Sequence, residues 1–522
     1  MGMLTGRLHV VQHDDVEKIS MKRIGIVDLG SNSVRLVIMD IGPEGEYHQM
    51  ENIKETVRLV EGVGPDGSID PKTQEHALET LSFFARLCKV RKVDEIIAVA
   101  TAAVRRAPNR DEVLATIHRE TGIQVKVLSG DEEAHLDYVG IVNSVAPETG
   151  LIVDVGGGST KIVGYRNRLK EESVTLPFGI VTLTQEFGLD DKIADATLQA
   201  LEKALFEEFE SLSWLSGYGT LIALGGTART LARIDRRRRG YKPDITHGYE
   251  LDAESVFAIY QRLAGLDLQS RWRVPGMSLE RADVIVAGIG VISQLLQASG
   301  IDRVITSRSG IRDGLLFEYL TRNTGDPILP SVLMHSVDNL IRYYNLEEAH
   351  VRHVSNLALS LFDQLRPLHG LGTYERRLLI VASLLHDIGY AVNQENHHKH
   401  TFYMMLNARI NGLTHRELVT CAFVAASHER YYLQGARDYL IPAGPLHQED
   451  YRRIMLLSLI LRLAKSLDRG SSGVVEGLKV EFDDKTIRIK LRNRGKSRLE
   501  IQAAMAHGAD CKALLRRDLI IS

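Results

Sequence analysis

The sequence has few of the features that mark secreted, membrane-spanning or nucleic-acid-binding proteins. Only three of its 522 residues are cysteines, at positions without disulfide or metal-site spacing, which favours a reducing compartment. No apolar run reaches the roughly 18 residues of a membrane helix, and residues 1–20 lack the apolar centre of a signal peptide. A net charge of −3 gives no general attraction to nucleic acid or membranes. We therefore predict a cytoplasmic protein, with neither as a partner, that begins with a disordered tail over residues 1–20.

The chain is long enough for several domains, and its character changes once along its length. A length of 522 residues exceeds what one hydrophobic core supports, so we expect about three or four domains. Strand-like runs alternate with amphipathic helical stretches up to residue 320, which predicts α/β layers. Residues 330–470 have helical spacing throughout, and residues 323–330, "NTGDPILP", are the expected linker. The alternating segment 478–491 predicts a β-hairpin within a small α+β segment at the end.

Two segments share one design, in which a strand ends in Asp, a turn of small residues follows, and a second strand leaves. They are "GIVDLGSNSVRLVI" at 25–38 and "LIVDVGGGSTKIVGY" at 151–165. A turn rich in Gly and Ser exposes backbone N–H groups and hydroxyls that suit phosphate oxygens, although such turns also simply close hairpins. The repetition favours a duplicated fold whose halves face one ligand. The predicted phosphate-binding residues are Gly30, Ser31, Asn32 and Ser33 in the first turn, and Gly156, Gly157, Gly158, Ser159 and Thr160 in the second.

The acidic residues at the two strand ends, Asp28 and Asp154, need a separate explanation. A carboxylate cannot attract phosphate by itself, but it can hold a divalent cation or orient a water molecule beside one. The alternative is that each Asp only caps its turn. The repetition favours the first interpretation, so we predict that both residues belong to a phosphate-handling site.

Three further segments offer groups that suit anions. One is a Gly-Gly-Thr turn before a helix, whose amino terminus adds a partial positive charge. The others place arginines at small-residue turns, where charge-assisted hydrogen bonds to anionic oxygens are possible, although most surface arginines are only solvated. The candidates are Gly226 and Thr227 in 221–234, Arg308 and Arg312 in 307–316, and Arg105 or Arg106 in 101–107.

These motifs, taken in order, resemble those of a known family. "VDLGSNSVRL", "SGDEEAHL" at 129–136, "VDVGGGSTKIV", "LGGTART" and "SGIRDGLL" are similar to the motifs of the exopolyphosphatase and guanosine pentaphosphate phosphatase (Ppx/GppA) family. That family lies within the superfamily of acetate kinase, sugar kinases, Hsp70 and actin. The resemblance covers about residues 21–320. It implies two α/β domains of the actin-like, ribonuclease H-like (ASKHA) fold, over residues 21–145 and 146–322.

The resemblance also implies a chemistry, which is hydrolysis of the terminal phosphoanhydride of polyphosphate or of guanosine pentaphosphate. Glu133 matches the family's proposed catalytic base, which orients and deprotonates the attacking water. Without the resemblance, Glu133 would be interpreted as an exposed helix residue. Positioning and charge neutralisation should supply most of the catalysis, and we assign them to the two turns, to Asp28 and Asp154, to Arg105, and to Mg²⁺ or Mn²⁺ held at Asp154.

One residue departs from the family's pattern. Lys161 stands where the second turn usually continues with a Glu that is thought to help hold the metal. Either Asp154 and the phosphate carry the ion together with water, or Lys161 supplies part of the ion's charge.

The helical region, expected over residues 323–472 and followed by the α+β segment 473–522, has polar residues of its own. "LLIVASLLHDIGY" at 378–390 predicts a buried helix that ends in a His-Asp pair, which is costly to bury unless it is paired or metal-bound. The order His, His-Asp, Asp resembles the HD superfamily of metal-dependent phosphohydrolases and suits a first-row divalent metal. The alternative is an unmetallated pair in a structural or regulatory pocket. The candidate ligands are His353, His386, Asp387 and Asp468, with His400 and His428 as further candidates.

Several functions follow from these features. We predict an exopolyphosphatase that processively releases orthophosphate from inorganic polyphosphate. The first alternative is a guanosine pentaphosphate (pppGpp) 5'-phosphohydrolase, since both substrates present a terminal anhydride. The second is an alarmone-regulated phosphatase whose helical domain binds guanosine penta- or tetraphosphate, and the third is an actin-like kinase. By resemblance we expect a homodimer.

Overall fold

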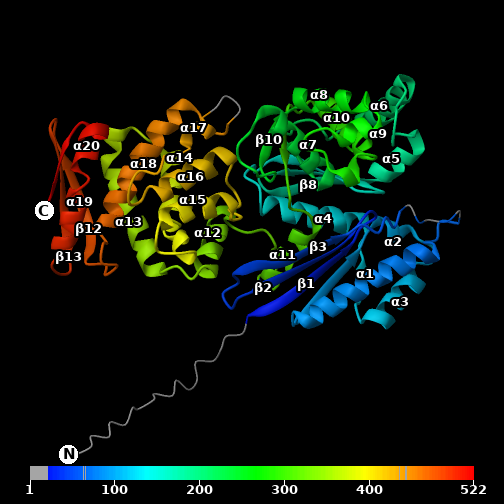
Figure 1. Cartoon of the computed structure of the whole chain (residues 1–522), viewed down its shortest axis with the longest axis horizontal. Coiled ribbons are helices and arrows are strands. Elements are labelled where there is room, and N and C mark those ends of the chain that lie inside the picture. The colour runs from blue at the N-terminus through cyan, green and yellow to red at the C-terminus, as the bar shows by residue number, and fades with distance from the viewer. Residues whose placement is uncertain (1–20, 61, 63, 65, 434, 441–443) are drawn as a thin grey trace, which may run out of the picture.

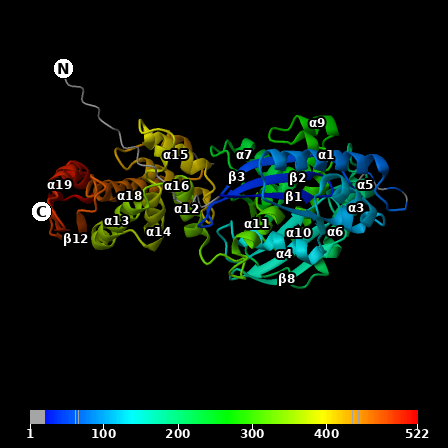
Figure 2. The same ribbon diagram turned by 90° about the horizontal axis from the view of Figure 1, so that it is seen from below.

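The computed structural model describes residues 21–60, 62, 64, 66–433, 435–440 and 444–522, so the tail predicted over residues 1–20 lies outside the described residues. Figures 1 and 2 show an elongated molecule, with two α/β units at one end, a helical domain in the middle and a small sheet at the other end. No helix within the described ranges is long and apolar enough to cross a membrane.

A five-stranded sheet forms the first α/β unit. Its strands in spatial order are β3 (Tyr47–Glu55), β2 (Val34–Ile41), β1 (Lys22–Leu29), β4 (Glu95–Ala100) and β5 (Val125–Val127). β1 pairs with β2 in antiparallel and with β4 in parallel orientation, so the first Gly-Ser turn lies at the carboxyl end of β1. The helices that follow these strands are α1 (Pro71–Val90), α2 (Ala102–Arg106) and α3 (Arg110–Thr121).

A six-stranded sheet repeats this arrangement in the second unit. Its strands in spatial order are β10 (Tyr249–Asp252), β11 (Arg303–Thr306), β9 (Leu221–Leu224), β6 (Gly150–Val155), β7 (Thr160–Arg166) and β8 (Leu169–Leu176). β6 pairs antiparallel with β7 and parallel with β9, as β1 does with β2 and β4. Its helices are α5 (Ile180–Phe187), α6 (Asp195–Glu210), α7 (Gly225–Arg239), α8 (Ala253–Ala264), α9 (Leu268–Trp272), the 3-10 helix η1 (Leu279–Arg281) and α10 (Ile285–Ser299).

Two helices connect the units, α4 (Gly130–Val142) and α11 (Ile311–Thr321). Figure 1 shows α4 between the two sheets. Its start is fixed by a capping box, in which the Ser129 side chain accepts from the Glu132 N–H and the Glu132 side chain accepts from the Ser129 N–H. Leu315 and Leu316 of α11 pack in one cluster with Ile24 of β1. Phe317 of the same helix packs with Ile152 and Ile222 of the second sheet, so α11 contributes to the cores of both units, and the expected boundary at residue 322 stays a prediction.

The remaining chain forms the helical domain and the terminal sheet. Ile487 and Ile489 of the terminal sheet share one apolar core with the helices, so no gap in packing marks the expected boundary at residue 472. The helices are α12 (Val332–Tyr343), α13 (Glu348–His369), α14 (Thr373–Leu384), η2 (Ile388–Ala391), α15 (His397–Asn407), α16 (His415–Ala426), α17 (Ala436–Tyr439) and α18 (Gln448–Ser466). The terminal segment has β12 (Val475–Phe482), β13 (Thr486–Asn493), α19 (Arg498–Met505), α20 (Gly508–Leu515) and β14 (Asp518–Ile521).

The predicted fold class is confirmed. Two actin-like α/β sheets are followed by an all-α domain and a small terminal sheet of order β12-β13-β14. The order of periodicities in the sequence predicted α/β layers followed by a helical region, and the family resemblance implied that the α/β layers are actin-like.

Candidate functional site

The two Gly-Ser turns meet across the gap between the two sheets. A Cβ atom added to Gly157 would lie 2.9 Å from the Cβ of Ser31, so the turns approach as closely as a glycine allows. A cavity of about 160 Å³ opens between them. The duplicated sequence motif therefore forms the two walls of one small cavity.

Most of the predicted phosphate-site residues line this inter-sheet cavity, but several do not. Outside the lining are Glu133, Arg105, Gly158, Thr160 and Thr227. Thr160 is instead engaged with the backbone, because its Oγ1 donates to the carbonyl oxygen of Phe178 at 2.9 Å. The predicted residues in the lining are Asp28, Gly30, Ser31, Asn32, Ser33, Asp154, Gly156, Gly157, Ser159, Gly226, Arg308 and Arg312.

Glu133 is buried beside the cavity and is held by two cations. Its side chain is fully inaccessible to solvent, and the Nζ of Lys161 lies 2.6 Å from its Oε2. The Arg105 guanidinium donates to the other carboxylate oxygen. Lys161 also reaches Asp154, with 3.3 Å between Nζ and Oδ2. Arg105 and Lys161 therefore fix the position of Glu133, and Lys161 links it to the cavity-lining carboxylate Asp154.

Asp137 is a second buried carboxylate, to which the sequence analysis gave no role. It lies one helical turn after Glu133 on α4 and lines the inter-sheet cavity. Its Oδ2 has no hydrogen-bond partner among the described residues. Burial, together with the nearby charge of Asp154, raises the pKa of Asp137 well above its usual range. Its spacing of four residues from Glu133, which puts both on one helix face, was the available signal.

The ammonium of Lys161 lies among the buried carboxylates of Glu133, Asp137 and Asp154. Burial alone would lower its pKa, but the carboxylates of Asp154, Glu133 and Asp137 raise the pKa above its usual value, so the side chain stays an ammonium. Asp28 also lines the cavity, and burial raises its pKa. An ammonium thus stands where the sequence comparison expected a metal-holding Glu.

The cavity offers a divalent cation a partial set of ligands. Groups of three or more metal-ligating side chains occur, among the described residues, only in the helical domain. Asp28 and Asp154 can therefore hold an ion only together with water and phosphate oxygens, which is how Mg²⁺ is commonly bound. The residues present fit Mg²⁺ in that manner.

Arginines form the rest of the cavity wall. Arg35, Arg229 and Arg281 line it together with Arg308 and Arg312. Burial and the neighbouring arginines lower the pKa of Arg229 to about 9 and that of Arg35 to about 10. Such crowding of cations is unfavourable unless an anion is bound between them. Arg35 and Arg229 stand inside the motifs "SNSVRL" and "LGGTART", which was the available signal, whereas Arg281 had none.

A second, larger cavity adjoins the first. Arg35, Arg229, Arg308 and Arg312 line both the inter-sheet cavity and a cavity of about 550 Å³ that extends to α12 and to Arg409 of the helical domain. These four arginines therefore form a cationic wall that both cavities share, and we call this wall the cationic passage.

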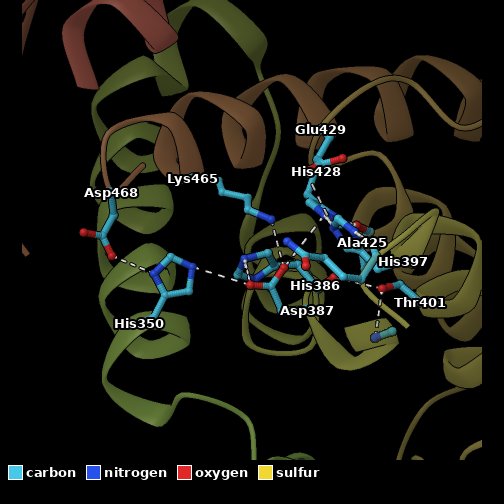
Figure 3. Close-up of polar contacts among 12 residues, drawn as sticks. His350, His386, Asp387, His397, Thr401, Ala425, His428, Glu429, Lys465 and Asp468 are labelled. Carbon is cyan, nitrogen blue, oxygen red and sulfur yellow. Dashed lines mark hydrogen bonds and ion pairs between the residues drawn. The ribbon is translucent and has the colours of Figure 1, made fainter. Parts of the chain in front are cut away.

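The helical domain holds a separate cluster of histidines around Asp387 (Figure 3). Two groups of side chains there have ligand atoms that all lie within 4.8 Å of one another. The first group is His350, His386 and Asp387, and the second is Asp387, His397 and His428. Hydrogen bonds to Asp387 and Asp468 raise the pKa of His350 to about 9, whereas burial lowers that of His386 to about 4. The cluster could hold a metal ion.

Three of the predicted ligands, His353, His400 and Asp468, lie outside these groups. His350, rather than His353, approaches both Asp468 and Asp387, since its position on α13 is nearly one turn earlier. His397 at the start of α15 takes part, whereas His400 does not. Asp468 contacts the first group through His350, with 2.7 Å between its Oδ2 and the His350 Nδ1. The structure brings together the helices that the sequence predicted, and at two of them a histidine from the neighbouring turn, His350 or His397, joins the cluster.

Comparison with curated proteins finds relatives along most of the chain. It is 26% identical over 475 residues to the guanosine-5'-triphosphate,3'-diphosphate pyrophosphatase of Aeromonas hydrophila, covering 89% of this chain and 91% of that protein. A protein of the same name from Pseudoalteromonas translucida is 25% identical over 454 residues, covering 85% and 88%.

Solved structures match somewhat more than half of the chain. A Ppx/GppA family member from Aquifex aeolicus is 31% identical, with a TM-score of 0.52, and the match covers 58% of this chain and 99% of that one. An exopolyphosphatase from Cytophaga hutchinsonii is 26% identical, with a TM-score of 0.54, over 58% and 98%. Residues 37–323 match the Ppx/GppA phosphatase family model, and residues 332–515 match the model of its domain III. The chain therefore belongs to the Ppx/GppA phosphatase family.

Proposed function

We propose that the protein is an exopolyphosphatase that releases orthophosphate from the end of inorganic polyphosphate. The observation that carries this proposal is the cationic passage of Arg35, Arg229, Arg308 and Arg312, which lines both cavities. A terminal phosphate alone would need only the two Gly-Ser turns. A passage lined by arginines beyond the turns suits a long polyanion, whose successive phosphates each need a counter-charge.

In this proposal the two turns bind the terminal phosphate, and the carboxylates beside them act on water. The water oxygen bonds to the terminal phosphorus, the bridging anhydride oxygen leaves with the shortened chain, and Glu133 accepts the proton of the water. Arg105 and Lys161 hold the Glu133 carboxylate in place. Asp28 and Asp154 would hold Mg²⁺ together with the phosphate, and the ion would neutralise phosphate charge.

The second candidate is hydrolysis of guanosine pentaphosphate. It is favoured by the relatives that match most of this chain, which are guanosine-5'-triphosphate,3'-diphosphate pyrophosphatases. The same turns would bind the terminal phosphate of the nucleotide, and the nucleoside would extend into the 550 Å³ cavity, where Tyr343 and Tyr344 are aromatic lining residues. The two candidates differ in what occupies this cavity.

The test is phosphate release from long-chain polyphosphate and from guanosine pentaphosphate, measured separately with Mg²⁺ and again after chelation. We expect phosphate release from both substrates to depend on Mg²⁺. With the polyphosphate concentration counted as chain ends, kcat/KM should be higher for polyphosphate than for guanosine pentaphosphate. A higher value for the nucleotide would favour the second candidate. Transfer of phosphate to an added acceptor without release of free phosphate would contradict both and indicate a kinase.

Replacing Arg229 by Gln is expected to raise KM for polyphosphate by about 10- to 100-fold, because charge-assisted hydrogen bonds contribute roughly 1.5–3 kcal/mol each. The increase should be smaller at high ionic strength, since salt screens the attraction. The matched control is Arg237→Gln, on the same helix but exposed to solvent, which should leave KM unchanged. Equal effects of the two variants would contradict a polyanion path along Arg229.

A further inference from the structure

The turn at residues 307–310, directly before α11, is contacted by the helical domain. Arg308 in this turn and Arg312 at the start of α11 line the inter-sheet cavity and belong to the cationic passage. The segment 408–414 joins α15 to α16 in the helical domain. Its Arg409 reaches Ser309 in the turn, across 100 residues of sequence. A turn that binds an anion needs neighbours that fix its side chains, and here one of these neighbours comes from another domain.

Arg409 holds the turn directly and through Asp313. Its Nη2 donates to the Oγ of Ser309 at 2.6 Å and lies 2.6 Å from the Oδ1 of Asp313. The other carboxylate oxygen of Asp313, Oδ2, accepts a hydrogen bond from the Gly310 N–H at 3.1 Å. A side chain at the third helical position that accepts from this N–H stabilises the start of a helix. Arg409 therefore holds both the turn and the start of the helix that carries Arg312.

A second contact from the helical domain reaches the same turn through His247. The Nε2 of His415, the first residue of α16, lies 2.9 Å from the carbonyl oxygen of His247. The Nδ1 of His247 accepts from the Arg308 N–H at 3.3 Å, and its Nε2 lies 3.3 Å from the carbonyl oxygen of Ser144. Burial, together with the charge of Arg409, lowers the pKa of His247 to about 3, so the ring is neutral. A neutral ring accepts at one nitrogen and donates from the other, as these two contacts require.

The charges around the turn indicate how Arg409 acts. Burial lowers the pKa of Arg308, and the positive charge of Arg409 lowers it further, whereas the Asp313 carboxylate acts in the opposite direction. Arg409 lies outside the lining of the inter-sheet cavity, and its Nη2 is engaged with Ser309 and Asp313. Its effect on an anion in that cavity is therefore exerted through the turn and not by direct contact.

We propose that Arg409 is a positioning residue of the inter-sheet cavity, which holds the turn 307–310 so that Arg308 and Arg312 face a bound phosphate. The inference rests on the proposed function, in which this cavity binds the terminal phosphate. It gives the helical domain a part in the phosphate site, because the arginine-bearing wall of the cavity is held in place only while this domain is docked on it.

The first test measures binding of inorganic phosphate to the full-length chain by isothermal titration calorimetry with Mg²⁺ present. Arg409→Met should raise Kd about tenfold, because arginines on a loosened turn are no longer aimed at the anion. Arg409→Lys should raise Kd only about two- to threefold, since its ammonium can still pair with Asp313 but lacks the planar fork of arginine. The matched control is Arg342→Met on α12, whose guanidinium also pairs across domains, at 3.0 Å from Glu44, and which should leave Kd unchanged.

A double-mutant cycle separates positioning from direct binding. In a protein that already carries Arg308→Gln and Arg312→Gln, adding Arg409→Met should weaken phosphate binding by less than about twofold, because residues that act through one another are not additive. An effect of Arg409→Met that is equally large with and without the two turn arginines would overturn the proposal, since Arg409 would then bind the anion itself. An unchanged Kd in Arg409→Met alone would also overturn it.

Amide hydrogen exchange tests the support of the turn without any phosphate. Peptides that cover residues 305–316 should exchange at least about fivefold faster in Arg409→Met than in the wild type, because exchange reports local opening. The same peptides should be unchanged in Arg342→Met. Equal exchange in Arg409→Met and the wild type would overturn the proposal. Thermal melting checks that each variant folds, and Arg409→Lys carries both tests if Arg409→Met does not fold.

Failure of the proposed function gives a different result. A wild type that releases phosphate from neither polyphosphate nor guanosine pentaphosphate would contradict that function. Faster exchange of residues 305–316 in Arg409→Met would still show in that case that Arg409 holds the turn, whereas unchanged exchange in an active enzyme would overturn the role of Arg409 alone.

Discussion

Replacing Glu133 by Gln is expected to reduce phosphate release from polyphosphate by a factor of about 10² to 10⁴, the range typical of a general base. The amide has nearly the same shape but cannot accept a proton from water. It also loses the negative charge that Arg105 and Lys161 hold in place. The measurement is kcat with saturating polyphosphate and Mg²⁺, because a loss confined to the transition state lowers kcat without requiring a change in KM.

The variant should still fold, because Lys161 keeps Asp154 and Asp137 as buried counter-charges. Glu132→Gln is the matched control, since this neighbouring carboxylate pairs with Lys126 near the surface, and its kcat should stay near that of the wild type. Asp137→Asn tests the alternative that Asp137, and not Glu133, is the general base. If release survives in Glu133→Gln but is lost in Asp137→Asn, the base is the carboxylate that lines the cavity.

Replacing Lys161 by Met is expected to lower the free energy of unfolding by about 3–5 kcal/mol, the usual cost of removing one partner from a buried ion pair. The lysine is 4% exposed, and its ammonium faces Glu133, Asp154 and Asp137. Without it these carboxylates would stay close together with too little positive charge. The measurement is urea unfolding at neutral pH, with the denaturant slope compared to confirm two-state behaviour.

The loss of unfolding free energy in the Lys161→Met protein should depend on pH in a defined direction. A carboxyl group whose pKa is higher in the folded than in the unfolded state binds protons on folding, so stability rises as the pH falls through the raised pKa. The pKa of Asp137 is already raised in the wild type, and loss of the ammonium raises it further. The difference between variant and wild type should therefore shrink toward acidic pH.

Lys203→Met provides the control for this stability measurement. Lys203 pairs with Glu207 on the surface of α6, where its side chain is 76% exposed. Exposed pairs contribute little, so the change should stay below about 1 kcal/mol and show no comparable dependence on pH. A Lys161→Met protein as stable as this control would mean that the carboxylates near Lys161 are not charged together in the native state.

The duplicated motif and the change in periodicity were readable from the sequence. Gly30 is favoured by a local contact, because a Cβ there would lie 3.0 Å from the carbonyl oxygen of Ser33 in the same turn, so its role is visible from the motif alone. The same holds for the buried helix before His386 and Asp387, whose pattern is local. Family resemblance then supplied the chemistry of Glu133, which no local pattern could have given.

The pairing of distant side chains was decided by tertiary packing. His350 and His353 are equivalent in the sequence, and only the packing of α13 against Asp468 and Asp387 selects His350. In the same way, Asp137 and Arg281 enter the inter-sheet cavity only because α4 and η1 reach it from different parts of the fold.

The sequence by itself therefore determined the α/β region, the helical domain and the two Gly-Ser turns, because strands, helices and turns depend on neighbouring residues, and the family resemblance identified the α/β units as actin-like. Tertiary structure alone decided that Lys161 is held among buried carboxylates, that four arginines line two cavities, and that four imidazoles lie around Asp387. The physical reason is that charge and ligand geometry depend on distances across the fold. A change of one helical turn, which hardly alters a hydrophobic pattern, exchanges one side chain in a site for another.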